Sequence, residues 1–349
     1  MKTEVFKIDT LDSGALALID KAAAIIKNGG LVVFPTETVY GLGGDATNEA
    51  SSKKIYEAKG RPSDNPLIIH IDEPKMAEEY AHTSPLYYAL AARFMPGPLT
   101  VVLKAKETVP LATRGGLDTV AVRCPEAKIA RELIKRAGVP IAAPSANLSG
   151  SPSPTTASHA LDDMQGRVDA IIDGGDSEIG LESTIVKIDG DNELTLLRPG
   201  KITPDELLSV ASCVNIADAV TDKLREGEVA LSPGMKYKHY APKAPVILLD
   251  GDAASMINYV KKTEEGKLAL IVYDKDFELF KKALPDAVIY NFGACGMPEE
   301  QAHVLFSILR DTDKHSFDKI FAPLPCTSGV GLALYNRMIR ASAHKIIRL

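Results

Sequence analysis

The sequence predicts an α/β protein of two domains: an open, mixed-sheet domain followed by a smaller domain with a doubly wound parallel sheet. The chain has 349 residues, enough for two domains of roughly 150 residues each. Strand and helix patterns alternate nearly throughout, which indicates the α/β class. Hydrophobic residues make up 45% of the chain and charged residues 25%, which is typical of a globular protein.

Several strands in the first half are not separated by helices, which predicts a mixed rather than a purely parallel sheet. Apolar residues at helical spacing predict helices over 13–28, 49–59 and 126–137. Short runs of apolar and β-branched residues predict strands over 31–34, 67–71, 99–103, 119–123, 141–143, 170–173, 184–188 and 194–197.

The C-terminal part of the chain predicts four consecutive strand–helix units, the pattern of a small, doubly wound parallel sheet. The predicted strands are 246–249, 268–272, 287–291 and 319–322, and the predicted helices are 253–262, 277–283, 298–310 and 331–344. We therefore place the first domain at 1–211, an ordered interdomain linker at 212–245, and the small second domain at 246–349.

Composition and charge exclude several classes of protein. No apolar run approaches the 18 or so residues of a transmembrane helix, and the N-terminus MKTEVFKIDTLD lacks the apolar core of a signal peptide. A cytoplasmic protein is therefore expected. The four cysteines are far apart and form no CxxC pair, which argues against a zinc ribbon and a disulfide framework. The net charge of −6 disfavours a globally basic nucleic-acid binder but leaves a local basic cleft open.

Two polar clusters stand out in the first half. PTETVYGLG, over 35–43, follows a predicted strand, so its polar groups emerge where ligands of α/β sheets gather, although a plain strand-to-helix turn explains it equally well. KGRPSDNPL, over 59–67, is held extended by two prolines, so that Lys59 and Arg61 face the same way and suit a polyphosphate. For a lone Lys-x-Arg, a solvated basic turn is the better interpretation, and a lone His70 is more often a core histidine.

A third cluster, PSAN, follows the predicted strand 141–143 and points Ser145 and Asn147 to one side, where they can bind phosphate oxygens or ribose hydroxyls. A helix cap or an Asx-turn is the alternative. Arg123 and Arg198 lie on predicted strands, where burial is costly unless the guanidinium meets an anion. The alternatives are a structural ion pair for Arg123 and an exposed edge position for Arg198.

The common catalytic motifs are absent. The chain contains no GxxxxGK[ST], no HExxH, no GxSxG and no Cys–His zinc spacing, and Gly329-Val330-Gly331 favours a tight turn over a phosphate loop. A site built from Lys, Arg, Ser, Thr and Asn works by positioning its substrates and by stabilising charge.

Taken together and in this order, the motifs resemble the two-domain form of L-threonylcarbamoyladenylate synthase along essentially the whole chain. The resemblance rests on FPTETVYGLG (34–43), KGRPSDNPLIIH (59–70), GLDTVAVRCP (116–125), VPIAAPSANLSG (139–150), SPSPT (151–155), ESTIV (182–186), LRPG (197–200) and SPGMKYKHYAP (232–242). The last motif is typical of the two-domain form.

The resemblance implies an open α/β catalytic domain with a concave basic face and a small Rossmann-like second domain. It implies a nucleotidyltransferase that forms threonylcarbamoyl-AMP and pyrophosphate from L-threonine, bicarbonate and ATP, with Mg²⁺ accompanying ATP. The product then serves a downstream transferase, which modifies the tRNA adenosine next to the anticodon. A weak contact with RNA stays open, and no membrane partner is expected.

The resemblance also implies the site residues, matched one by one to the motifs. Lys59 and Arg61 are the expected catalytic cations, and no metal ligand from the protein is assigned. The expected ATP contacts are Lys59, Arg61, Asn65, Thr119, Ser145, Asn147, Ser153, Arg198 and Tyr240. The expected threonine contacts are Thr38, His70, Arg123, Ala143 through its backbone, and Ser183.

The segment 232–242 is too rich in Tyr, His and Lys for a simple tether, because flexible tethers are Gly/Ser-rich. We expect it to act as a lid in which Tyr240 covers the adenylate and keeps water from the carbamate.

Two other classes are the alternatives. Carbamoyltransferases of hydrogenase maturation contain a related domain, but in longer chains with zinc-binding cysteine pairs. A double-stranded RNA-binding protein without catalysis would use the same face, but the net charge of −6 and the many small-ligand residues weigh against it.

Overall fold

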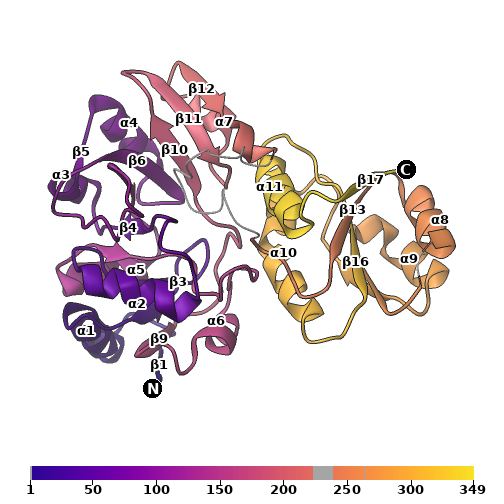
Figure 1. The fold of residues 1–349 in the computed structure, drawn as a ribbon, viewed down its shortest axis with the longest axis horizontal. Coiled ribbons are helices and arrows are strands. Elements are labelled where there is room, and N and C mark those ends of the chain that lie inside the picture. Colours follow the sequence, from indigo (N-terminus) through magenta and orange to yellow (C-terminus); the bar gives the residue numbers. More distant parts are fainter. Residues whose placement is uncertain (1, 223–238, 264) are drawn as a thin grey trace. The chain divides into compact units, whose positions relative to one another are not determined.

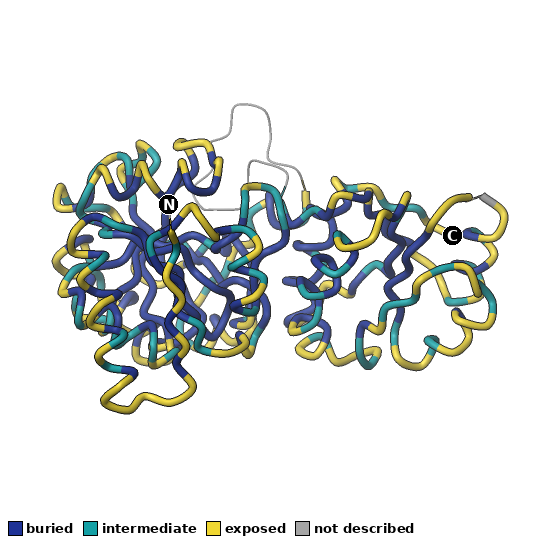
Figure 2. The backbone as a smooth tube through the Cα atoms, turned by 90° about the horizontal axis from the view of Figure 1, so that it is seen from below, coloured by how far each residue is buried: buried dark blue, intermediate teal, exposed yellow. Residues whose placement is uncertain are grey.

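The computed structural model describes residues 2–222, 239–263 and 265–349 (Figure 1). These residues divide into two compact units, each with its own sheet. The first unit holds residues 2–149 and 153–222, and the second holds 150–152 together with the described residues from 239 onward. In Figure 2, buried segments form the inside of each unit and exposed segments lie on its outside.

The first unit is built on a mixed sheet in the order β1-β9-β2-β3-β8-β4-β7-β6-β10-β11-β12, with β5 paired to β6. Its strands are β1 (Glu4–Lys7), β2 (Val32–Phe34), β3 (Gly41–Asp45), β4 (Ile68–His70), β5 (Ala81–His82), β6 (Leu99–Ala105), β7 (Thr119–Arg123), β8 (Ile141–Ala142), β9 (Ala170–Asp173), β10 (Thr184–Ile188), β11 (Glu193–Arg198) and β12 (Cys213–Ile216). The predicted mixed sheet is therefore confirmed.

Helices cover part of this sheet. They are α1 (Ser13–Lys27), α2 (Glu49–Lys59), α3 (Ala77–Tyr80), α4 (Pro85–Phe94), α5 (Lys128–Ala137), α6 (Ala157–Met164) and α7 (Pro204–Leu207), with 3₁₀ turns at Pro74–Met76 and Asp218–Val220. Apolar side chains of α1 and α5, among them Ile19, Ile26 and Leu133, pack with Val32 and Phe34 of β2 in one buried core. That core fixes the carboxyl end of β2, where the first polar cluster begins.

Strand β3 was not predicted, because its sequence GLGGD has little β-propensity. It forms through tertiary packing, since it pairs antiparallel with both β2 and β8. A Cβ on Gly43 would lie 2.7 Å from Phe34 Cε1 and 2.8 Å from Ile141 Cγ2, so this position in the strand requires glycine. The alternative of a plain strand-to-helix turn is thus wrong, because β2 and β3 form a hairpin.

The first unit extends past the expected boundary at residue 211. Strand β12, inside the segment predicted as a linker, pairs in parallel with β11 and forms an edge of the sheet. Its sequence CVNI is short and only partly buried, which explains why the pattern of the sequence did not indicate a strand. Residues 223–238, which include 232–238 of the predicted lid, lie outside the described residues.

The second unit is a parallel five-stranded sheet in the order β15-β14-β16-β13-β17. Its strands are β13 (Val246–Asp250), β14 (Leu268–Val272), β15 (Val288–Asn291), β16 (Lys319–Pro323) and β17 (Ile346–Arg348). Its helices are α8 (Ala253–Thr263), α9 (Phe277–Ala283), α10 (Pro298–Thr312) and α11 (Gly331–Ala341), with a 3₁₀ turn at Asp274–Asp276. Helices α8 and α9 cover one face and α10 and α11 the other (Figure 1), which confirms the predicted doubly wound sheet.

Within the residues that the structure describes, no helix has the length and apolar character needed to cross a membrane.

Adding one methyl group to β3 should destabilise the first unit. The Cβ of a Gly43→Ala variant would press on Phe34 and Ile141, and overpacking of this kind costs about 1–3 kcal/mol. Thermal unfolding followed by circular dichroism should show a midpoint several degrees lower. Gly190→Ala is the matched control, because a Cβ there meets nothing within 4 Å. Equal midpoints for the two variants would contradict the packing argument.

Candidate active site

The register of the first sheet places three of the predicted site residues in one row. The positions paired in turn across β8, β4, β7, β6, β10 and β11 are Ile141, His70, Arg123, Thr100, Ile185 and Arg198. Directly paired residues of neighbouring strands carry their side chains on the same face of a sheet. His70, Arg123 and Arg198 therefore share one face.

A second row on the same face is apolar. Ile68 and Ala121 lie two residues before His70 and Arg123, and they pack together with Val102, Ile185 and Leu197. Thr119 lies two residues further back, at the opposite end of β7. At about 3.3 Å per residue, Thr119 and Arg123 are about 13 Å apart. The face is thus an apolar floor with polar groups at both ends.

Arg123 and Glu37 form a buried ion pair at one end of this floor. Arg123 Nη2 donates to Glu37 Oε1 at 2.6 Å, and each side chain is only 5% exposed. Burial on its own would raise the pKa of Glu37, but the charge and hydrogen bond of Arg123 and nearby backbone N–H groups hold it below its usual range. In the described part of the chain, the buried Nε of Arg123 has no hydrogen-bond partner. A carboxylate ligand would accept a hydrogen bond from this Nε–H group.

His70 lies beside this pair and is neutral. Burial, with a smaller contribution from the charge of Arg123, lowers its pKa to about 3, although Glu37 opposes the shift. The ring of Phe34 packs edge-on against the imidazole, with centroids 6.2 Å apart. Among the described residues, Nδ1 of His70 is buried without a hydrogen-bond partner. A neutral imidazole of this kind suits a hydroxyl ligand.

The loop before β3 lies beside the end of β8 and contributes the hydroxyl groups of Thr36 and Thr38 to the site. Thr36 Oγ1 donates to the carbonyl of Val39 at 2.6 Å and lies 2.8 Å from Thr38 Oγ1. Since the Thr36 proton is used in this way, the Thr38 hydroxyl donates to Thr36 and keeps its lone pairs for a ligand. A Cβ on Gly41 would lie 3.3 Å from Cβ of Ala143, which packs this loop closely on the end of β8.

Lys59 orders the Ser-x-Asn loop. Its ammonium donates to the carbonyl oxygens of Ser145 and of Asn147, the second at 2.6 Å, and lies 3.4 Å from Asn147 Oδ1. Ser145 Oγ donates to Asn147 Oδ1 at 2.5 Å. Two segments that are far apart in the sequence thus meet here: the end of α2 and the Ser-x-Asn pair.

Arg61 is held by its own loop. Arg61 Nη2 donates to the carbonyl oxygens of Asn65 and Pro66, both at 3.1 Å. The Asn65 side chain is 1% exposed, and both of its polar atoms are without a hydrogen-bond partner in the described residues. The segment from Lys59 to Arg61 was expected to be extended, with both side chains facing the same way. This is wrong, because Lys59 is the last residue of helix α2 and Gly60 has a left-handed backbone with φ 61°.

At the other end of the row, Arg198 is hydrogen-bonded to Ser183. Arg198 donates to the Ser183 carbonyl at 3.0 Å and to its hydroxyl at 3.1 Å, and the same hydroxyl lies 2.7 Å from Thr100 Oγ1. Gly200 is required here, because a Cβ would lie 2.5 Å from the backbone nitrogen of Thr184.

Ser153 is completely buried and donates its hydroxyl proton to Glu182 Oε1. The Ser153 hydroxyl can therefore accept a hydrogen bond from a ligand but not donate one, as is the case for Thr38 and Ser145.

Residues 24–200 match the family described as "Telomere recombination", and residues 202–343 match "Threonylcarbamoyl-AMP synthase, C-terminal domain". The threonylcarbamoyl-AMP synthase of Pyrococcus abyssi is 45% identical over 338 residues, 94% of this chain and 95% of that relative. The Bacillus subtilis threonylcarbamoyl-AMP synthase is 38% identical, with 100% of both chains covered. The chain belongs to the threonylcarbamoyl-AMP synthase family.

A crystal structure of P. abyssi Sua5 complexed with L-threonine matches this member of the threonylcarbamoyl-AMP synthase family with a TM-score of 0.91. The match has 41% identity and covers 99% of this chain and 100% of that one. The family resemblance drawn from the motifs is confirmed, and so is the expectation of an enzyme of this class.

Within this family member, the structure gathers most of the predicted site residues in the first unit. Thr38, His70, Arg123, Ala143 and Ser183 surround one end of the floor. Arg61, Asn65 and Thr119 lie toward the opposite ends of β4 and β7. Their roles as threonine and ATP contacts stay predictions.

Tyr240 is described in its own unit. It belongs to the second unit, where its ring stacks on Phe306 at 5.3 Å and lies under the guanidinium of Arg337 at 5.6 Å. Its backbone is left-handed, with φ 63°. The predicted contact of Tyr240 with ATP stays a prediction, and most of the lid segment lies outside the described residues.

Sequence reasoning missed two buried carboxylates of the site. Glu37 and Glu182 stand inside the quoted motifs PTETVYGLG and ESTIV, but no role was given to either. Their burial next to Arg123 and Ser153 depends on contacts across 86 and 29 residues. Position inside a motif was the one signal that pointed to them.

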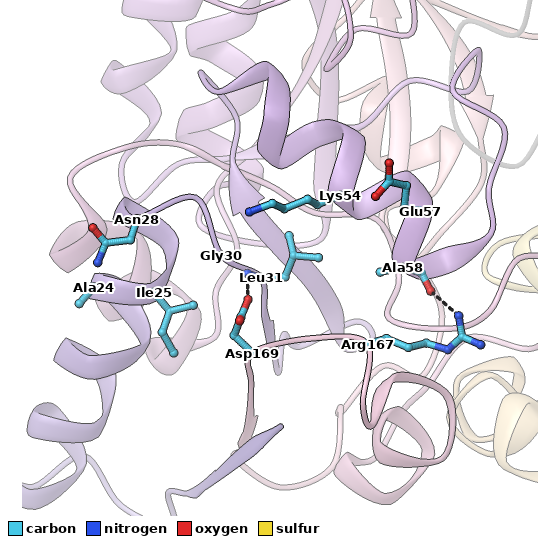
Figure 3. Close-up of a pocket in the computed structure, with 10 residues that line it drawn as sticks. All are labelled: Ala24, Ile25, Asn28, Gly30, Leu31, Lys54, Glu57, Ala58, Arg167 and Asp169. Carbon is cyan, nitrogen blue, oxygen red and sulfur yellow. Dashed lines mark hydrogen bonds between the residues drawn. The ribbon is translucent and has the colours of Figure 1, made fainter. Parts of the chain in front are cut away.

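A separate cavity of about 630 Å³ lies between the ends of α1 and α2 (Figure 3). Three of its polar side chains form hydrogen bonds with the backbone around it: Lys54 donates to Gly29, Arg167 donates to Ala58, and Asp169 accepts from Leu31. None of the predicted site residues lines it, and we assign it no ligand.

The neutral state of His70 should make the protein less stable in acid. The unfolded chain takes up a proton below pH of about 6.5, whereas the folded chain resists it down to a pKa of about 3. Stability from this residue is therefore present above pH 6.5 and falls by about 1.4 kcal/mol per pH unit below it.

A His70→Gln variant should lose this pH dependence, which amounts to about 2 kcal/mol between pH 7.5 and pH 5. Urea unfolding of both proteins at the two pH values measures it. The exposed His82 provides the matched control variant, His82→Gln. An equal drop for the His70→Gln variant and the unsubstituted protein would contradict a neutral His70.

Proposed function

We propose that this protein forms threonylcarbamoyl-AMP and pyrophosphate from L-threonine, bicarbonate and ATP. Its membership of the threonylcarbamoyl-AMP synthase family supports the proposal. The observation that carries it is the floor formed by β4 and β7, which has buried polar atoms without hydrogen-bond partners at both of its ends. These atoms are His70 Nδ1 and Arg123 Nε at one end and the side-chain amide of Asn65 at the other end. A product that joins an amino acid to a nucleotide needs two such ends.

Threonine fits the end at His70 and Arg123. The free Nε of Arg123 suits the carboxylate, and neutral His70 and the Thr38 lone pairs suit the hydroxyl and amine. The P. abyssi Sua5 crystal structure is a complex with L-threonine, which supports the same assignment here.

ATP fits the end at Arg61, Asn65 and Thr119. Arg61 and Lys59 are oriented by carbonyl oxygens, so their charges are placed before a polyphosphate arrives. Ser145 and Ser153 donate their protons to protein acceptors, so they suit ribose hydroxyls or adenine N–H groups rather than phosphate oxygens.

The chemistry needs no protein nucleophile. The threonine amine attacks bicarbonate, loses a proton and releases water to give a carbamate. A carbamate oxygen then attacks the α-phosphorus of ATP, the new P–O bond forms, and the bond to the β-phosphate oxygen breaks to release pyrophosphate. The residues of this site align the two substrates and stabilise the charge of the leaving group.

Mg²⁺ is part of this proposal as a companion of ATP, where it would neutralise phosphate charge. Among the residues described, no group of three or more metal-ligating side chains lies together, so we assign no protein ligands and route no step through the ion. We further propose that the product is handed to a transferase that modifies tRNA.

Pyrophosphate release from ATP tests the function. Release by the full chain should require both threonine and bicarbonate. 2-Aminobutyrate should be a poor substrate and serine an intermediate one, because a site built for a hydroxyl leaves polar groups unpaired without it. Dependence on carbamoyl phosphate would instead indicate a carbamoyltransferase. No release at all would favour an RNA-binding protein.

Arg61→Ala should lower the rate of pyrophosphate release at least about tenfold. A lost charge-assisted contact is worth about 1.5–3 kcal/mol, and the guanidinium is already oriented by Asn65 and Pro66. Arg93→Ala, which removes an exposed guanidinium next to Phe94, is the control. Near-normal activity of a folded Arg61→Ala variant would remove Arg61 from the site.

A further inference from the structure

Glu37 touches both ends of the loop that follows β7. Its Oε1 accepts from Arg123 at the start of the loop, at 2.6 Å, and its Oε2 accepts from the backbone N–H of Ala127 at the end of the loop, at 3.3 Å. Ala127 is the N-cap of helix α5, which has no side-chain cap of its own. One carboxylate thus ties the guanidinium of Arg123 to the start of a rigid helix.

We propose that Glu37 is a positioning residue of the threonine site, which holds Arg123 in the orientation that presents its free Nε edge to the substrate carboxylate. This inference rests on the proposed function. Glu37 uses one N–H of Nη2, and the buried Nε has no hydrogen-bond partner in the described residues. A guanidinium has five N–H donors in a fixed plane, so fixing one edge fixes the direction of the other.

The alternative is a role in stability alone. A buried guanidinium without a counter-ion is costly, so Glu37 also stabilises the fold in the absence of substrate. Both roles predict a less stable protein when the carboxylate is removed. They differ in threonine binding, because a stabilising contact far from the substrate leaves the affinity of the folded protein unchanged.

The choice of variant follows from the surroundings of Glu37. It lines a cavity of about 590 Å³ together with the start of α5, so truncation to Ala would open that cavity toward Arg123. Glu37→Gln keeps the shape and one acceptor while it removes the charge and one of the two contacts. Glu126→Gln is the matched control, because it removes an exposed carboxylate from the wall of the same cavity, whereas the ion pair of Arg123 is with Glu37.

Threonine binding by the full chain, measured by calorimetry because the chain has no tryptophan, provides the test. We expect Glu37→Gln to weaken threonine binding about tenfold, with ATP binding unchanged and Glu126→Gln equal to the unsubstituted protein. In the pyrophosphate assay, KM for threonine should rise while kcat stays within about twofold. Adding Glu37→Gln to an Arg123→Met variant should weaken threonine binding no further, since Glu37 acts through Arg123.

Unchanged threonine affinity in a folded Glu37→Gln variant, or a further loss in the double variant, would overturn the positioning role. If Glu37→Gln does not fold, Glu37→Asp keeps the charge but is one methylene short, and normal threonine affinity in that variant would overturn the role in the same way. Failure of the unsubstituted protein to bind threonine would instead overturn the proposed function, and this inference with it.

Discussion

The pairing of β4 with β7 is the constraint on which the site depends. His70 pairs with Arg123 and Ile68 with Ala121, so the polar row and the apolar floor follow from one register. A slip of one residue would turn both rows to the opposite face of the sheet. The antiparallel pairing of β6 with β7 then carries the same row to Thr100 and onward to Arg198. The side chains of this row are thus positioned by the hydrogen bonds of the sheet, whereas Thr38, Ser145 and Arg61 are positioned by loops.

The two ends of the floor leave polar groups unsatisfied, and this costs stability. Each buried donor or acceptor without a partner costs about 1–3 kcal/mol, and His70, Arg123 and Asn65 all contribute one or more such atoms within the described chain. The charge at the end near Arg123 is nevertheless balanced, because Glu37 is ionised beside Arg123 and His70 is neutral. Such an end recognises a ligand by complementary hydrogen bonds rather than by net charge.

The sequence motifs identified the family, the two sheets and most of the polar residues near the floor, because those residues follow strand ends. The motifs did not predict β3, since Gly43 is in the strand for its lack of a side chain and not for its propensity. They did not predict that Lys59 would bond to the Ser-x-Asn loop from the end of a helix, because that contact spans 86 residues. Nor did they reveal the buried carboxylate of Glu37, whose partner Arg123 is equally distant in the chain. In each case the deciding interaction is tertiary, and local patterns do not contain it.

The length of the floor fits the proposed reaction. Threonylcarbamoyl-AMP carries its amino acid and its nucleotide at opposite ends, and the polar groups at Thr119 and Arg123 are separated by about 13 Å of one strand. The proposed bond between carbamate and α-phosphorus would then form over the apolar side chains of Ile68, Ala121 and Val102. Apolar surroundings strengthen the electrostatic contacts at either end and disfavour water, which would hydrolyse the carbamate. An enzyme that supplies no nucleophile of its own depends on this arrangement, because alignment, exclusion of water and stabilisation of charge are what it contributes to the proposed step.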